Sequence, residues 1–260
     1  MTIDLAHHLL GAFSGSLVGL TLGLFGGGGS ILAVPLMVYV VGVADAHVAI
    51  GTSALAVAAN AAANLVTHAR RGNVRWRCAL IYSAAGVGGA FLGSLAGKAL
   101  DSGKLLFLFA LLMLIVGVLM FLGRNRQEHD AGVCTLENAP KTLGFGAATG
   151  AVAGFFGIGG GFLIVPGLVA ATGMPMLAAI GSSLVAVTAF GLTTSLSYAA
   201  SGFVDWPLAA VFVAGGALGG IFGAFAAGQI SQRRGALNMM FAVLIVGVAL
   251  YMAFRSATSI

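Results

Sequence analysis

Two glycine-rich segments, GLFGGGGS at 23–30 and GFFGIGGG at 154–161, are the best candidates for a ligand-binding site in this sequence. Glycine inside a helix costs about 1 kcal/mol relative to alanine, so we expect a helix to break at each segment. A helix that restarts near Ile31 or Phe162 presents unpaired N–H groups and the positive end of its dipole, which favour an anion. We therefore predict substrate-binding positions at Gly26, Gly27, Gly28, Gly29, Ser30, Gly157, Gly159, Gly160 and Gly161.

These glycine runs do not match the known nucleotide-binding loops. A phosphate-binding loop needs Gly-Lys-Ser/Thr after its glycines, and Ser30 follows Gly29 without a lysine. The dinucleotide pattern fails because Phe162 stands where its third glycine is required. The alternative to a binding site is close helix packing, but three or four adjacent glycines exceed what packing needs.

Polar side chains in the long apolar runs after each glycine segment are the second set of candidates. Asn60 and Asn64 are four residues apart and share a helical face, and their amide donors would suit a sulfonate or carboxylate oxygen. The alternative for each hydroxyl is a hydrogen bond between helices. The further predicted binding residues are Thr52, Ser53, Ser182, Ser183 and Thr194.

The composition requires a lipid environment for the elements that carry these residues. Of 260 residues, 59% are hydrophobic and only 7% are charged, which excludes a soluble domain of this size. Apolar runs of about 20 residues follow one another, as membrane-spanning helices require. The basic residues lie between these runs, so we interpret them as orientation signals and not as a nucleic-acid surface.

The sequence consists of two related halves. Residues 19–35 and 150–166 share nine identities in 17 positions at an offset of 131. At an offset of 130, AIGTS at 49–53 matches AIGSS at 179–183, and Gly72-x-Val-x-Trp76 matches Gly202-x-Val-x-Trp206. We predict an all-α polytopic membrane protein with two homologous repeats, each made of a glycine-broken helical hairpin and three further transmembrane helices.

The predicted organisation is a first membrane repeat at 1–123, a polar cytoplasmic linker at 124–141 and a second membrane repeat at 142–260. Glycines at helical spacing in the later spans, such as Gly86, Gly89 and Gly93, favour close packing of helices. The expected spans are 8–25, 30–42, 46–68, 77–99 and 104–122 in the first repeat, and 142–156, 161–172, 176–200, 206–228 and 236–254 in the second.

The distribution of basic residues favours inverted repeats. If each glycine-broken pair is a hairpin, nine Lys and Arg lie on the expected cytoplasmic side and three on the other. If each pair makes one interrupted crossing instead, the repeats are parallel and the split is eight against four. The inverted arrangement brings the two breaks together from opposite faces near the bilayer midplane.

Ionisable groups are scarce inside the predicted spans. All seven Asp and Glu residues fall at the termini or in connections, which argues against ion coupling through a buried carboxylate and leaves passive export or co-movement of a proton. His47 and His68 lie at opposite ends of one span, where we expect interfacial histidines, and a role in proton coupling is the alternative. No HExxH motif, carboxylate pair or Ser-His neighbourhood is visible, so we expect neither an enzyme nor a metal or other cofactor.

Three pairs of motifs recur in the two halves: the glycine segments GLFGGGGSILAVP and GFFGIGGGFLIVP, the AIGTS and AIGSS segments, and the two Gly-x-Val-x-Trp corners. With these motifs, the whole chain resembles the sulfite exporter TauE/SafE family, also called the toluene sulfonate uptake permease family. The resemblance implies transport of sulfite, sulfoacetate or related small organic anions across a prokaryotic plasma (inner) membrane. The motif positions leave the substrate and direction unresolved.

Our leading hypothesis is an exporter that alternates access to one anion held between Gly26–Ser30 and Gly157–Gly161, with Asn60, Asn64 and Thr194 along the path. The alternative is an anion or small-solute channel, for which the same polar face would form a wet pore. We expect the lipid bilayer and a small anionic substrate as partners, and no nucleic acid. The sequence leaves the oligomeric state open, and a homodimer is compatible with it.

Overall fold

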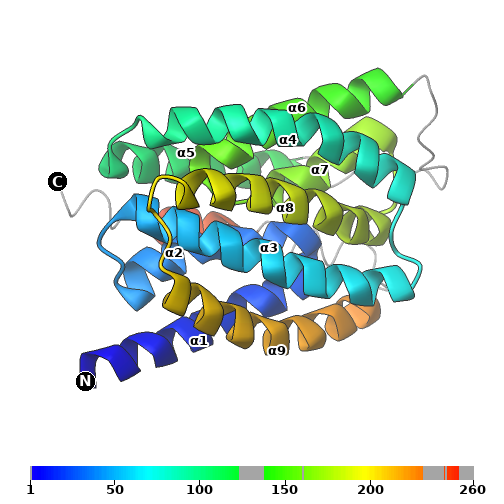
Figure 1. The fold of residues 1–260 in the computed structure, drawn as a ribbon. Helices are drawn as coiled ribbons and strands as arrows, with labels where there is room; N and C mark the ends of the chain where they lie inside the picture. The colour runs from blue at the N-terminus through cyan, green and yellow to red at the C-terminus, as the bar shows by residue number, and fades with distance from the viewer. Residues whose placement is uncertain (1, 123–137, 160, 231–242, 244, 252–260) are drawn as a thin grey trace.

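The structure is a computed structural model that describes residues 2–122, 138–159, 161–230, 243 and 245–251. The described residues form helices and turns and contain no strand, so the predicted all-α class is confirmed (Figure 1). The linker at 124–141 and the span at 236–254 lie largely outside them. The elements are α1 (Thr2–Phe25), the 3₁₀-helix η1 (Gly26–Leu32), α2 (Ala33–Leu36), the π-helix η2 (Met37–Val41), α3 (Ala46–Arg70), α4 (Trp76–Lys98), α5 (Ser102–Leu122), α6 (Ala139–Phe156), α7 (Gly161–Thr172), α8 (Met176–Ala199) and α9 (Trp206–Ile230).

Five of the described helices are long and apolar enough to cross a membrane. These stretches are Ala6–Phe25, Ala46–Arg70, Trp76–Lys98, Met176–Ala199 and Trp206–Ala227. Large apolar side chains cover the outer surface of the bundle; Leu196 is 68% exposed and Phe222 is 71% exposed. Such a surface is stable in hydrocarbon, so the chain is a multi-pass membrane protein.

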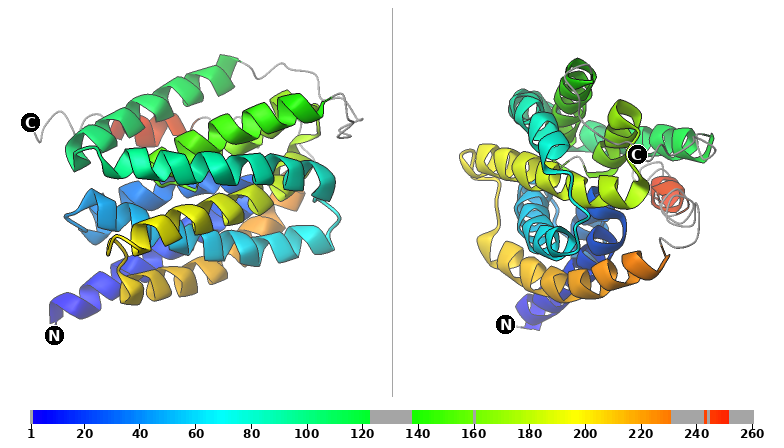
Figure 2. Two further views of the ribbon diagram at one scale, coloured as in Figure 1. Left: turned by 45° about the horizontal axis from the view of Figure 1, so that its top comes forward. Right: turned by 90° about the vertical axis from the view of Figure 1, so that its right-hand side faces the viewer.

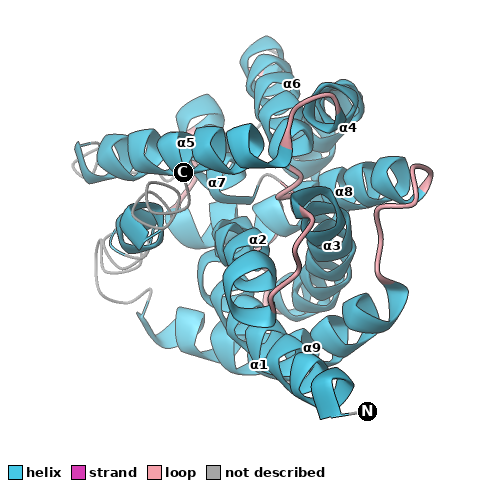
Figure 3. Ribbon diagram, turned by 90° about the vertical axis from the view of Figure 1, so that its left-hand side faces the viewer, coloured by secondary structure: helices cyan, strands magenta, loops and turns pink. Residues whose placement is uncertain are grey.

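The bundle has a central helix pair enclosed by two outer pairs. α3 and α8 pack against each other in the middle, with α4 and α6 on one side and α1 and α9 on the other (Figures 2 and 3). α8 also contacts α4, and α3 also contacts α9. The segments that carry the predicted binding residues therefore lie inside the bundle.

The outer pair α1 and α9 is held by glycines. Gly15 lies on the backbone of Phe212, and Gly19 lies on that of Gly216, where an added Cβ would overlap the opposing carbonyl oxygen. Ascending residue numbers meet ascending ones, so the two helices run parallel. Glycine permits this approach because it has no Cβ, as at other small-residue helix contacts in membranes.

The other outer pair, α4 and α6, makes the corresponding contacts. Gly146 lies on the backbone of Tyr82, and Gly150 lies on that of Gly86. Each of these residues is offset by 131 or 130 positions from its counterpart in the α1–α9 pair. The predicted packing role of the glycines in these spans is confirmed; Gly89 and Gly93 also lie on the backbone of α6, at Ala147 and Ala151.

The central helices α3 and α8 run antiparallel. Gly191 lies beside Ala58, and Gly51 lies beside Tyr198, so rising numbers in one helix meet falling numbers in the other. The start of α3 and the end of α8 therefore share one end of the bundle, and the end of α3 and the start of α8 share the opposite end (Figure 1).

Both glycine segments interrupt the α-helices, as predicted, and the chain then folds back. The segment from η1 to η2 returns along α1, and α7 packs against α6. The restart expected near Ile31 lies two residues before the observed one. Regular α-helix resumes at Ala33 and lasts only four residues, because the consecutive glycines Gly26–Gly29 adopt a tighter 3₁₀ winding that continues to Leu32. The second restart, at Gly161, is one residue from the expected position.

Candidate anion site at the helix breaks

The first break is anchored to α8 by one buried serine. Gly26 has φ +61°, a left-handed conformation that glycine adopts without strain, and it lies against Ile180 and Ser183. The Ser183 hydroxyl accepts a hydrogen bond from the Gly27 N–H at 3.0 Å and donates to the Ile180 carbonyl at 2.8 Å. Three predicted binding residues thus lie together, with their polar groups already paired.

A second set of hydrogen bonds closes the first hairpin. The Ser30 hydroxyl donates to the Gly27 carbonyl at 2.9 Å. Gly29 lies against the backbone of Thr21 and Leu22 in α1, and its carbonyl lies 3.2 Å from the Thr21 hydroxyl. Gly28 belongs to the same 3₁₀ segment. Thr21 is not among the binding residues predicted from the sequence; its place eight residues before Gly29, on the far side of a predicted hairpin, was the available signal.

The second break turns at Gly157, which has φ +64° and caps the end of α6. Its N–H donates to the Gly154 carbonyl at 3.2 Å, and its Cα faces the Ile50 side chain. Gly159, with φ +62°, lies between Val57 and Val187. Gly161 is the first residue of α7, and Gly160 lies outside the described residues.

The two breaks are in contact inside the bundle, but their turning glycines lie at different heights along the bundle axis. η1 packs against α7, so segments about 130 residues apart are neighbours. Gly26 lies beside Ile180, near the start of α8, whereas Gly157 lies beside Ile50, near the start of α3 at the opposite end. Each hairpin therefore reaches past the bundle centre. Gly159, between the middle residues of α3 and α8, lies closest to it.

Asn60 and Asn64 form a buried polar stripe on α3 that faces α9. Both lie over glycines of α9, Asn60 on Gly216 and Asn64 on Gly220. The Asn64 amide donates to the Asn60 carbonyl at 2.9 Å. The Asn60 side chain is fully buried, and neither its Nδ2 nor its Oδ1 has a partner among the described residues. An unpaired buried amide is costly, so this position favours a polar ligand or water.

Two further predicted residues lie on the inner faces of the central helices. Ser53 is buried and donates to the Ile50 carbonyl at 3.1 Å, within its own helix. Thr194 is fully buried, and its hydroxyl has no partner in the described part of the chain. Thr194 is the counterpart of Asn64 at an offset of 130, so both halves carry a buried polar side chain at this position of the repeat.

Thr52 and Ser182 lie apart from this group, at the two ends of the bundle. The Thr52 hydroxyl accepts a hydrogen bond from the backbone N–H of Asp205 at 2.9 Å. The Ser182 hydroxyl accepts one from the backbone N–H of Arg75 at 2.8 Å. Each hydroxyl thus stabilises one of the two Gly-x-Val-x-Trp corners, and this role accounts for its burial.

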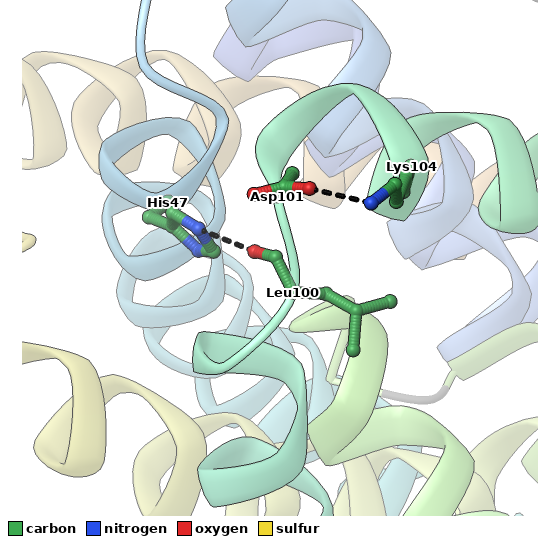
Figure 4. A network of polar contacts seen from close by, with 4 residues as sticks. All are labelled: His47, Leu100, Asp101 and Lys104. Atoms are coloured by element: carbon green, nitrogen blue, oxygen red, sulfur yellow. Dashed lines mark hydrogen bonds and ion pairs between the residues drawn. The ribbon is translucent and has the colours of Figure 1, made fainter.

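The two histidines of α3 have different environments. His47 is half-buried, and its Nε2 lies 3.1 Å from the Leu100 carbonyl, which ties the start of α3 to the α4–α5 connection (Figure 4). Asp101 in that connection pairs with Lys104 at 2.8 Å, and the hydrogen bond and charge of this lysine lower the pKa of the aspartate. His68, at the opposite end of α3, is in contrast only 1% exposed.

The candidate binding residues described above offer only neutral polar groups: amides, hydroxyls and backbone N–H groups. α7 begins at Gly161, directly after the second break, so the positive end of its dipole lies there. No cluster of three or more His, Cys, Asp or Glu that could hold a metal ion occurs in the part of the chain that the structure describes. Amide, hydroxyl and backbone N–H donors are groups that would suit a small oxyanion.

Comparison with known proteins places the chain among membrane transporters. Residues 11–252 match the sequence family described as sulfite exporter TauE/SafE. A "Probable membrane transporter protein" of Xylella fastidiosa strain 9a5c is 52% identical over 248 residues, covering 95% of each chain. The "Probable membrane transporter protein YunE" of Bacillus subtilis is 26% identical over 263 residues, covering 93% of this chain and 94% of that protein. No solved structure matches the chain.

Proposed function

We propose that this chain, which belongs to the sulfite exporter TauE/SafE family of membrane transporters, exports small organosulfur or organic anions such as sulfite, sulfoacetate or related sulfonates across a prokaryotic inner membrane. The observation that carries this proposal is the packing of η1 against α7 in the bundle interior. Irregular backbone at membrane depth is tolerated where it is buried in protein or lines a cavity, and paired breaks of this kind are typical of substrate sites in transporters.

The proposed substrate site lies near the centre of the bundle, between Gly26–Ser30 and Gly157–Gly161. Backbone N–H groups at the start of α7 supply donors to the anion, and the unpaired amide of Asn60, which faces α9, lies along the path. Lys and Arg occur at the ends of the described helices and not in their middle, so binding depends on dipoles and neutral donors. We therefore expect moderate affinity, which suits a carrier that must release its substrate.

Two inverted repeats provide the alternating access. The glycine contacts of α1 with α9 recur, at offsets of 131 and 130, between α6 and α4, and the helices within each pair run parallel. The antiparallel crossing of α3 and α8 supports a two-fold axis in the membrane plane. Exchange of the two halves about this axis would open the site to each side in turn.

The test is flux of labelled sulfite and sulfoacetate into proteoliposomes. Gly159→Ala forces a side chain onto a left-handed backbone beside Val57, and we expect transport to fall at least tenfold, about 1.4 kcal/mol. Gly88→Ala is the matched control, because nothing lies within 4 Å of its added Cβ. Equal, undiminished flux in both variants would remove the assignment of the site.

Two further measurements sharpen the test. Asn60→Asp keeps the shape of the side chain but replaces donors by a carboxylate, so we expect it to abolish anion transport while Asn60→Ser retains part of it. Saturation of flux with substrate concentration separates the carrier from an open channel, whose flux continues to rise. Linear flux across the whole range would therefore favour the channel.

A further inference from the structure

His68 is a buried ionisable side chain placed next to the first break. It is 1% exposed near the end of α3, and its Nε2 lies 3.2 Å from the carbonyl oxygen of Gly23, three residues before the turn at Gly26. A carbonyl oxygen only accepts hydrogen bonds, so Nε2 carries the ring proton and Nδ1 is left as an unprotonated acceptor. Nδ1 is buried and has no partner among the described residues.

The described surroundings of His68 contain no negative charge that would compensate a proton on its ring. Arg71, three residues after His68, turns its guanidinium to α9, where Nη1 donates to the Ala224 carbonyl at 2.6 Å. The described parts of α1, η1 and α9 that pack at this end of α3 carry no ionisable side chain. No carboxylate of these described segments neutralises a proton on His68, so an anion bound at the break would supply the counter-charge.

His68 also ends the polar stripe that begins at the bundle centre. Asn60, Asn64 and His68 follow one another at intervals of four residues, so they share one face of α3. All three are buried, and Asn60 and Asn64 lie over glycines of α9. The stripe therefore leads from the unpaired amide of Asn60 to the free lone pair of His68.

We propose that Nδ1 of His68 binds the proton that moves together with the transported anion; this inference rests on the proposed function. A proton from one compartment binds Nδ1 and forms an imidazolium beside the first break, which raises the affinity for the anion. Release of the anion removes the counter-charge, and the proton leaves to the other compartment. Because binding linkage is reciprocal, a bound anion must also strengthen proton binding at His68.

The second half of the chain lacks an equivalent proton site. At an offset of 130, the residues corresponding to Asn60, Asn64 and His68 are Phe190, Thr194 and Tyr198. Tyr198 is fully buried like His68, but a phenol does not change charge near neutral pH. This asymmetry predicts that one proton moves with each anion, and Tyr198 serves as the control position.

The experiment uses full-length protein in proteoliposomes with sulfoacetate as the probe, at about pH 5.5 and about pH 7.5, on either side of the ordinary histidine pKa. A sulfonate and a carboxylate of low pKa stay largely ionised in this range, so the substrate itself carries little of the proton. We expect wild-type flux to be about tenfold higher at the acidic pH, and a pH-sensitive dye in the lumen to report acidification with uptake.

His68→Gln places an amide N–H where Nε2–H lies and keeps the bond to Gly23, but it cannot take up a proton. We expect this variant to lose both the pH dependence and the acidification, whereas His47→Gln and Tyr198→Phe keep both. If His68→Gln retains either property, the proposal is overturned. Circular dichroism and gel filtration show whether the variant is folded, and His68→Asn provides a second substitution.

A readout independent of flux separates this inference from the proposed function. NMR titration of histidine-labelled protein, with His68 assigned by comparison with His68→Gln, follows protonation of the ring directly. We expect sulfoacetate to raise the pKa of His68. Flux of sulfoacetate without such an effect would overturn the proton site alone, and a wild-type protein that neither binds nor carries any of the tested anions would overturn both.

Discussion

The hydroxyl of Thr52 accepts a hydrogen bond from the backbone N–H of Asp205 at 2.9 Å, across 153 residues of sequence. Ser182, 130 positions after Thr52, makes the corresponding bond to Arg75 at 2.8 Å at the other end of the bundle. Gly51 and Gly181, directly before these two residues, lie on the carbonyls of Phe203 and Asn73 in the same two corners. The AIGTS and AIGSS segments thus stabilise the two corners that connect the central helices to the outer helices.

Thr52→Val should therefore destabilise the protein. The substitution keeps the shape of the side chain but leaves the Asp205 N–H unpaired, which costs about 1–3 kcal/mol. Thr188→Val is the control, because its half-buried hydroxyl donates to Leu184 within the same helix. Unfolding in detergent measures the difference. An altered KM for sulfoacetate at unchanged stability would instead show that Thr52 contributes to substrate binding.

Ser183→Ala and Ser53→Ala form a matched pair at equivalent positions of the two halves. Removal of the Ser183 hydroxyl leaves the buried Gly27 N–H without its acceptor, so we expect a loss of about 1–3 kcal/mol in the free energy of unfolding. Ser53 bonds only to Ile50 in its own helix among the described residues, and its removal should cost less than about 1 kcal/mol. Equal losses in the two variants would contradict the anchoring role of Ser183.

The glycine contacts between outer helices predict a steep cost for added methyl groups. In Gly19→Ala and Gly150→Ala, the new Cβ meets the backbone of Gly216 and Gly86, and overpacking of this kind costs about 1–3 kcal/mol. Gly88→Ala, in open space on α4, should be neutral or stabilising by up to about 1 kcal/mol because alanine favours helix. Thermal unfolding of the three variants in one detergent provides the comparison.

The arrangement of α3 predicts the membrane topology. Arg71 follows the end of α3, whereas Asp205 is bonded near its start, so the two residues lie at opposite ends of a membrane-spanning helix. The described basic residues Arg70, Arg71, Arg75, Arg77 and Lys141 share the first of these ends. Reporter fusions should place Arg71 in the cytoplasm and Asp205 outside. Reporters on the same side would exclude the inverted arrangement.

The sequence by itself determined the class of the protein and most of its helix boundaries. Lipid selects for long apolar segments whose backbone is satisfied internally, and this constraint is local, so α4 (Trp76–Lys98) and α7 (Gly161–Thr172) follow the predicted spans within one residue. The positions of both helix breaks were predictable for the same reason, because a run of glycines destabilises helix wherever it lies. The family resemblance that the motifs carry was confirmed.

Only the tertiary structure decided which polar residues meet. The hydrogen-bond partners of Thr52, Ser182 and Ser183 lie more than 100 residues away in the sequence. The local sequence does not distinguish a hydroxyl that stabilises a Gly-x-Val-x-Trp corner from one without a partner among the described residues, such as that of Thr194. The burial of His68 likewise depends on the close approach of α1, which the glycines of α1 and α9 permit. The glycine segments are recognisable in the sequence, but their depth in the bundle and their neighbours result from packing, which is a property of the whole chain.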